Sequence, residues 1–293
     1  MAELLDGQFE IDGVTFGGPY DRVKIVKVDF PVPSWGTEDS DNTFTPGLMM
    51  GTDLLRPGQF VFELRTDTYT IDNAKAAAEE LAAAWLRGGT RKPGDMSILR
   101  YRVGNRVRRV YGRGRNYSHD FDQWSYSGTS PILASFDMDR HLFFDDLERD
   151  VLVGYTPPVT GGLVAPLSAP LTATGTGATG VGGFIGDVGG TAPTPVVIEL
   201  HGPTQYATVV GDTWSVAYAK PIAADQVVTI DTRHPYSLVY DNFGRILNGN
   251  LSWKTNLQRA TITPGSEMIS YKGYDTTNTS YARVKWRAAY MTY

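Results

Sequence analysis

Apolar and polar positions alternate over much of this chain, which predicts β-strands. In residues 59–65, Phe60, Phe62 and Leu64 recur at every second position and would share one face of a strand. The alternation continues over residues 132–144 and predicts a single long strand there. Further strands are predicted over residues 97–103, 106–111, 196–200, 227–231, 236–240, 268–274 and 281–290. A series of short strands with turn residues between them is typical of a sandwich or jelly roll.

Two local patterns refine this interpretation. Gly104-Asn105 separates two predicted strands, and glycine at the first central position predicts a hairpin with a type II′ turn. Residues 73–87 have helical spacing instead, with Asp72 as the predicted N-cap and Gly88-Gly89 as the stop. The apolar stripe of this helix comprises Ala77, Leu81, Ala84, Trp85 and Gly88. We expect the helix to be structural and to pack on a flat apolar surface such as a sheet.

A stretch with almost no charge divides the chain. Residues 156–195 are rich in Gly, Thr, Pro and Ala, and Asp187 is their only ionisable side chain. Composition alone suggests a linker between two β-rich units. The predicted fold is therefore mainly β, with one β-rich unit on each side of this stretch, and the first unit carries the one helix.

Composition excludes several classes of protein. The 293 residues include 41% hydrophobic residues, enough for real cores, and the net charge of −5 does not suggest a nucleic-acid binder overall. The absence of cysteine excludes disulfides, thiolate catalysis and cysteine-based zinc sites. The first residues do not have the pattern of a signal peptide, and no window is apolar for long enough to predict a membrane span.

Two adjacent blocks of opposite charge stand out. Residues 87–115 hold ten Lys and Arg against Asp95 alone, and residues 120–150 hold eight Asp and Glu. With Tyr101, Tyr111 and Tyr117 interleaved, one interpretation is nucleic-acid binding through phosphate contacts and base stacking. The neighbouring acidic block favours protein–protein pairing, either within the chain or between copies of it. A solvated charged face is the third alternative.

No catalytic, cofactor or metal site is predicted. Residues 175–180 fit G-x-G-x-x-G, but the glycine-rich sequence that follows cannot form the helix that a dinucleotide site requires. Asp137, Asp139, Asp145 and Asp146 could offer oxygen ligands, yet the first two lie on the expected solvent face of a strand. The four histidines are scattered, without metal-ligand spacing. The aromatic residues of the second half are interpreted as core and subunit contacts, with sugar-stacking platforms as the alternative.

Several segments together resemble the distal tail proteins of long, non-contractile-tailed bacteriophages. They are IDGVTFGGPYDRVKIVKVDF, the helix end LAAAWLRGG, PILASFDMDRHLFF, GGLVAPLSAP, GDVGGTAPTPVVIELHGP, VVTIDTRHPYSLVYDNFGR, the turn at residues 263–269 and YARVKWRAAY. The match spans nearly the whole chain. The family's usual turn reads more like P-G-x-N, where this chain has Ser266-Glu267.

The resemblance implies a structural, non-enzymatic virion protein without cofactors. It implies an N-terminal β-barrel or sandwich domain with one helix that forms a hexameric ring, and a galectin-like C-terminal β-sandwich. Residues 156–195 would then begin the second domain, which gives an N-terminal domain of residues 1–155 and a C-terminal domain of residues 156–293, with residues 174–190 as a surface loop. The ring would join the tail tube to the tip complex. The implied partners are other copies, the tail tube protein, tail-associated hub and tape-measure proteins, and receptor-binding proteins; DNA would only pass through the channel.

The resemblance also implies assembly in the host cytoplasm and a final place in the tail tip of the virion. In a closed ring, one patch meets a different patch on the neighbour. We therefore hypothesise that Arg106, Arg108 and Arg109 of one copy meet Asp145, Asp146 or Glu148 of the next. The alternative function is a carbohydrate-binding module for recognition of the host cell surface.

Overall fold

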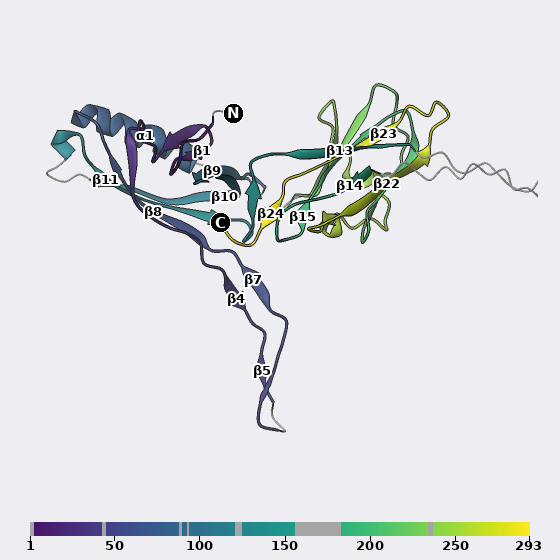
Figure 1. Ribbon diagram of the computed structural model, residues 1–293, viewed down its shortest axis with the longest axis horizontal. Helices are drawn as coiled ribbons and strands as arrows, with labels where there is room; N and C mark the ends of the chain where they lie inside the picture. The colour runs from purple at the N-terminus through teal and green to yellow at the C-terminus, as the bar shows by residue number, and fades with distance from the viewer. Residues whose placement is uncertain are drawn as a thin grey trace, which may run out of the picture. The chain divides into compact units, whose positions relative to one another are not determined.

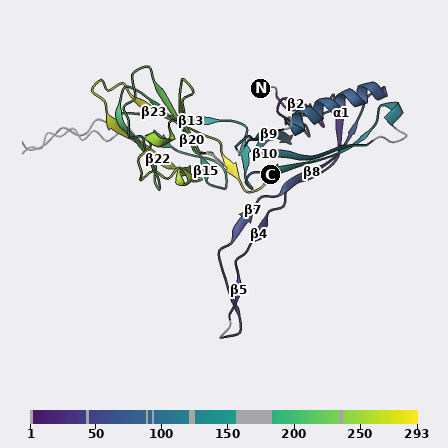
Figure 2. The same cartoon turned by 180° about the vertical axis from the view of Figure 1, so that it is seen from behind.

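The computed structural model divides the chain into two compact units. Unit 1 comprises Met1–Asp146 with Tyr290–Tyr293, and unit 2 comprises Leu147–Ala289 (Figures 1 and 2). The structure describes residues 3–42, 45–87, 90–92, 94–120, 125–155, 183–233 and 237–293. The fold is mainly β, as predicted. The observed division precedes the sequence-based boundary at 155/156, because β13 (Arg149–Gly154) pairs with a strand of unit 2.

Unit 1 is built on one antiparallel sheet. Its strand order is β2 (Val14–Phe16), β1 (Phe9–Ile11), β9 (Ser97–Val103), β10 (Arg106–His119), β11 (Pro131–Met138), β8 (Gln59–Thr66) and β3 (Val23–Asp29). β12 (Phe143–Asp145) pairs with β10, and β24 (Ala289–Tyr290) with β12. The predicted strand at residues 59–65 is confirmed as β8, and Phe60, Phe62 and Leu64 are all buried.

The predicted hairpin and the predicted long strand have different outcomes. β9 and β10 pair in antiparallel register on either side of Gly104-Asn105, and Gly104 has the positive φ of 60° that a type II′ turn requires at that position. The single strand predicted over residues 132–144 is wrong. It divides into β11 and β12, because the chain turns at residues 139–142, so alternation alone did not reveal the break around Arg140.

The one predicted helix is α1 (Ile71–Leu86), and it packs on the sheet as expected. Its N-cap is Thr70, not Asp72: the Thr70 side chain accepts a hydrogen bond from the Asn73 N–H at 3.3 Å. Asp72 lies in the first turn, where a negative charge still favours the helix dipole. The C-cap is Arg87, in the left-handed conformation with φ of 48°. The predicted stop at Gly88-Gly89 lies outside the described residues.

Trp85 joins the helix to the sheet. Its indole ring is fully buried and lies edge-on to Phe62, with ring centroids 5.5 Å apart. The indole N–H donates to the backbone carbonyl of Ser135 on β11 at 3.0 Å. Gly114 on β10 makes this packing possible, because a Cβ there would lie 2.4 Å from the Trp85 carbonyl oxygen.

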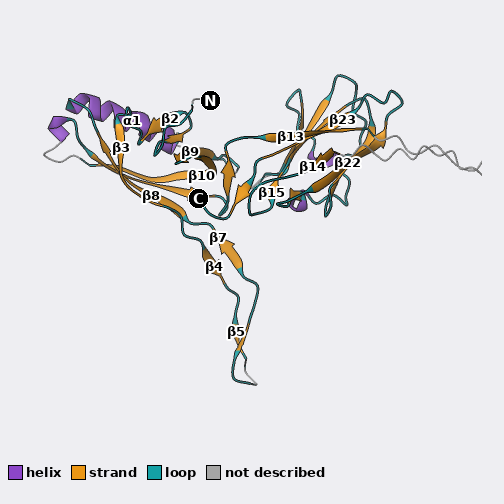
Figure 3. Cartoon of the chain, viewed as in Figure 1, coloured by secondary structure: helices purple, strands orange, loops and turns teal. Residues whose placement is uncertain are grey.

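Between β3 and β8 the chain forms a two-stranded arm, which we define as residues 31–42 and 45–58. β4 (Ser34–Gly36) pairs with β7 (Leu54–Arg56), and β5 (Ser40–Asp41) pairs with β6 (Leu48–Met49) (Figure 3). Neither ladder hydrogen-bonds to the main sheet of unit 1 within the described chain. The arm is therefore a two-stranded ribbon that is not part of the main sheet.

Unit 2 is a sandwich of two antiparallel sheets. One has the order β13, β23 (Tyr281–Trp286), β16 (Val197–His201), β19 (Val227–Asp231) and β20 (Leu238–Asp241). The other has the order β14 (Gly183–Ile185), β22 (Glu267–Tyr274), β17 (Gln205–Val210) and β18 (Ser215–Ala217). A short pair, β15 (Thr194–Pro195) with β21 (Thr261–Ile262), adjoins them. Inward residues of both sheets, such as Ile198, Val284, Val209 and Tyr271, form one core.

The strands predicted for this half are found with small shifts of their ends. The exception is the strand predicted over residues 281–290, which divides into β23 and β24. The surface loop predicted over residues 174–190 is wrong in part, since residues 183–185 form β14 and pair with β22. Residues 174–182 and the G-x-G-x-x-G at 175–180 lie outside the described residues. Three short 3-10 turns, η1 (Ser125–Ser127), η2 (Asn248–Asn250) and η3 (Leu257–Arg259), complete the described elements.

Candidate assembly surface

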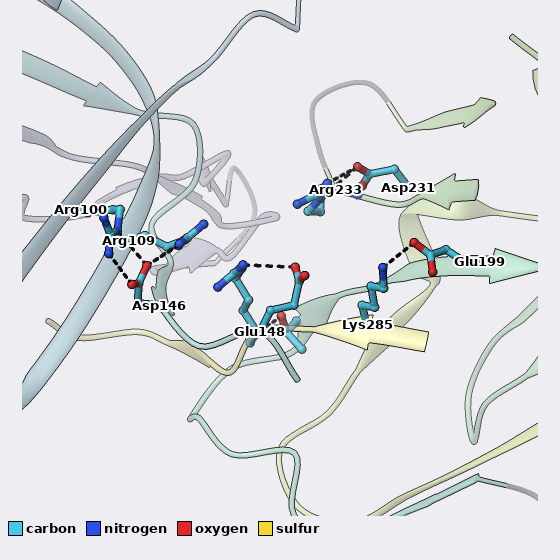
Figure 4. Close-up of polar contacts among 10 residues, drawn as sticks. Arg100, Arg109, Asp146, Glu148, Glu199, Asp231, Arg233 and Lys285 are labelled. Carbon is cyan, nitrogen blue, oxygen red and sulfur yellow. Dashed lines mark hydrogen bonds and ion pairs between the residues drawn. The ribbon is translucent and has the colours of Figure 1, made fainter. Parts of the chain in front are cut away.

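The basic block of the sequence folds into a buried ion-pair network in unit 1. Arg100 on β9 lies directly opposite Arg109 on β10, an arrangement that would repel by itself. The Asp146 carboxylate lies between the two guanidinium groups (Figure 4). It accepts from Arg100 at 3.0 and 2.7 Å and from Arg109 Nε at 3.0 Å, with a further short contact from Arg109 Nη2. Glu10 on β1 pairs with Arg100 at 2.7 Å, so two cations meet two anions.

This network holds Asp146, the last residue of the segment Met1–Asp146, against the main sheet of unit 1. Both arginines are almost fully buried, and isolated charges there would be costly. Burial by itself would raise the pKa of Asp146, but the hydrogen bonds from Arg100 and Arg109 outweigh it and lower the pKa below its ordinary value. Asp146 therefore stays ionised and holds β12 against β9 and β10. Sequence reasoning missed Glu10, whose isolated position gave no signal.

The six residues hypothesised to connect neighbouring copies fall into two groups. Arg108 and Asp145 form an ion pair within the chain at 3.7 Å, and Arg108 also lies over the Tyr290 ring, 3.7 Å from its centroid. Arg109 and Asp146 belong to the buried network. Arg106 and Glu148 have exposed side chains, although Glu148 accepts from Arg287 at 3.3 Å. The structure thus brings two of the predicted pairs together inside one chain.

Other residues of the basic block also have partners within unit 1. Arg91 donates to the backbone carbonyls of Trp85 and Gly114, and Arg113 donates to those of Lys92 and Asp95. Arg91 thereby supplies a cation at the C-terminal end of α1, where carbonyl groups lack helical partners. Much of the charge that suggested phosphate binding is therefore used within the chain.

The acidic block gives no metal site among the residues that the structure describes: no group of three or more potential ligands lies close enough to hold an ion. Asp137 pairs with Arg115 at 2.9 Å, and Asp139 lies 3.9 Å from Arg140. None of the described helices is long and apolar enough to cross a membrane.

The arm carries several exposed large apolar side chains. Its exposed large side chains include Trp35, at 62% exposure, and Met50, at 81%. The full set is Val32, Trp35, Leu48, Met49, Met50 and Leu54. Two-stranded ribbons are marginal in water, and clustered exposed apolar side chains mark interaction surfaces. The arm is therefore the best candidate for a surface that another molecule covers. The apolar residues of the arm follow no regular period, so the sequence pattern does not predict this surface.

The fold defined by these two units is that of phage baseplate and tail-hub proteins. A chain of the phage P2 baseplate in its activated conformation with Ca matches with a TM-score of 0.60 and 11% identity, covering 96% of this chain and 97% of that one. The SPP1 Dit protein, described as a paradigm of the hub adsorption apparatus in phages that infect Gram-positive bacteria, matches with a TM-score of 0.58 and 12% identity, covering 96% and 98%.

A chain of the P2 baseplate in its activated conformation with Sr is similar, with a TM-score of 0.57 at 11% identity and coverage of 95% and 97%. No protein-family model matches the sequence, and no curated protein does either. The likeness extends over both units, so the resemblance to distal tail proteins noted in the sequence is confirmed at the level of the fold.

Proposed function

We propose that this protein is a structural, non-enzymatic component of a phage tail tip. The observation that carries the proposal is the match of the whole two-unit chain to baseplate and Dit hub proteins. The match covers 96% of this chain and therefore includes both units. The protein is expected to join the tail tube to the baseplate and the host-recognition proteins, and to reside in the virion after assembly in the host cytoplasm.

The proposed assembly is a closed ring, expected to be a hexamer, formed by unit 1. Its contacts are heterologous, because a cyclic ring joins one patch to a different patch on the next copy. The arm supplies the first patch, since its apolar side chains lack a sheet to cover them. Arg106 and Glu148, the exposed members of the hypothesised set, are proposed to contribute at the edge of such a contact. Unit 2 is proposed to be galectin-like.

A variant of the arm tests this proposal. Trp35→Ser combined with Met50→Ser removes two exposed apolar side chains and should leave the core of unit 1 intact. We expect the wild-type chain to sediment as a discrete oligomer and the variant to shift to the monomer of 32.1 kDa in sedimentation velocity. The physical reason is the loss of apolar area buried between copies.

The matched control carries Phe184→Ser and Ile246→Ser, two similarly exposed apolar residues in unit 2. This control should keep the oligomer. A wild-type chain that stays monomeric at every concentration would refute the ring, and an unchanged oligomer in the arm variant would refute the role of the arm.

A further inference from the structure

Trp253 in unit 2 is the most exposed tryptophan of the described chain. It lies in the connection between η2 and η3, and 88% of its surface is accessible. By contrast, Trp214 and Trp286 of the same unit are buried in the core. The Lys254 ammonium lies 5.2 Å from the centroid of the Trp253 ring. An indole this exposed gains little of the burial that large aromatic side chains usually obtain, so its ring is available to contact a ligand.

The ring borders a shallow, open hollow of about 630 Å³. Besides Trp253, the lining comprises two leucines and six polar residues, namely Leu238, Leu257, Ser237, Asn248, Lys254, Thr255, Asn256 and Gln258. Most of these side chains are amides, hydroxyls or cations. A protein-binding hot spot would surround the tryptophan with other apolar side chains, so this lining favours a polyhydroxylated ligand.

Hydrogen bonds within the fold orient the two asparagines of the hollow. The Asn248 Oδ1 accepts from the Val239 N–H at 2.6 Å, and the Asn256 Oδ1 accepts from the Gln258 N–H at 3.0 Å. Each amide therefore has its oxygen committed to the backbone, while its NH₂ group has no hydrogen-bond partner among the described residues. Thr255 is fixed in the same way, since its Oγ1 accepts from the Ala217 N–H at 3.0 Å. The donors of the site are thus held in place before any ligand arrives.

We propose that this hollow binds a pyranose unit of a glycan. The apolar C–H face of the sugar ring would stack on the Trp253 indole, and the amide groups of Asn248 and Asn256 would donate to its hydroxyl oxygens. The Lys254 ammonium adds a further donor beside the ring. This inference concerns unit 2 alone and does not rest on the proposed ring.

The test uses the purified full chain on an array of pyranose monosaccharides and oligosaccharides, followed by calorimetric titration with the strongest glycan. We expect binding that Trp253→Ala weakens by about tenfold or more, as expected for loss of an aromatic anchor. Trp253→Tyr keeps a stacking ring and should retain part of the affinity. Phe184→Ala, a change at an exposed aromatic residue of unit 2 that does not line the hollow, is the control and should leave binding unchanged. Because Trp253 is so exposed, both of its variants should melt at the wild-type temperature.

Three outcomes would overturn the proposal. The first is that no glycan binds at millimolar concentration. The second is that Trp253→Ala binds the glycan as the wild type does. The third is that the substitution impairs only association with another protein. None of these outcomes would affect the sedimentation test of the ring, so the two proposals fail separately.

Discussion

At the scale of single residues, the ionised carboxylate of Asp146 explains how two facing arginines can be buried. Arg100 and Arg109 are each about 95% shielded from solvent, and their charges are balanced by Asp146 and Glu10. Removing one member of such a network leaves an uncompensated charge where water cannot reach it. The network is therefore expected to matter more for stability than any exposed ion pair of the chain.

We expect Asp146→Ala to lower the free energy of unfolding of unit 1 by about 3–5 kcal/mol. The measurement is urea-dependent hydrogen exchange of peptides from β9 and β10. Asp137→Ala is the matched control within unit 1, because it breaks the Arg115–Asp137 pair, whose side chains are both about half exposed. That control should cost about 0–1 kcal/mol. Equal effects of the two substitutions would contradict a special role for the buried network.

At the scale of elements, the turn between β22 and β23 depends on one carboxylate. Asp275 accepts from the backbone N–H groups of Thr277, Thr279 and Ser280 at 2.7–2.8 Å, and from the Thr277 hydroxyl. Burial alone would raise the pKa of Asp275, but these hydrogen bonds outweigh it and hold the pKa far below its ordinary range. The turn positions two strands that belong to different sheets of the sandwich.

This shift predicts a pH dependence with a definite sign. Since the folded-state pKa of Asp275 is depressed, its stabilisation is present above the unfolded pKa of about 3.9 and is lost as the pH falls below it. Asp275→Asn cannot titrate and should be less stable than the wild type at pH 7, by about 1–3 kcal/mol. The difference in melting temperature between the two proteins should shrink from pH 5 to pH 3. A constant difference over that range would contradict the assignment.

At the scale of the whole molecule, each unit has its own hydrophobic core. One core gathers aromatic residues such as Phe62, Trp85 and Tyr101, and the other gathers aliphatic strand residues such as Ile198 and Val284. A separate core is the physical condition for a domain that unfolds as its own cooperative unit. Assembly is proposed to depend on unit 1 and glycan binding on unit 2, so each proposed function belongs to a unit with its own core.

Calorimetry of the chain should therefore show two transitions. Gly114→Ala forces a methyl group against the Trp85 backbone and should destabilise unit 1 by about 1–3 kcal/mol, which lowers one transition only. Gly154→Ala is the control, because nothing lies within 4 Å of the added methyl. A single transition, moved as a whole by Gly114→Ala, would show that the two cores unfold together.

The sequence by itself determined the local elements of this protein. Alternation predicted β8 with its buried phenylalanines, helical spacing predicted α1, and glycine predicted the turn of the β9–β10 hairpin. The strand and the helix follow from the period of neighbouring apolar side chains. The turn follows from the backbone conformation that glycine allows. Both are local properties of the sequence. The overall resemblance to distal tail proteins was also visible in the sequence.

Only the tertiary structure decided which charges and aromatic residues are buried. Asp146 meets Arg100 across 46 positions of sequence, and Glu10 meets Arg100 across 90, so no local pattern could pair them. The same holds for Trp253, which the sequence could not distinguish from the buried Trp214 and Trp286. Burial is a property of how distant segments pack, and the strand period reports only which side chains share a face.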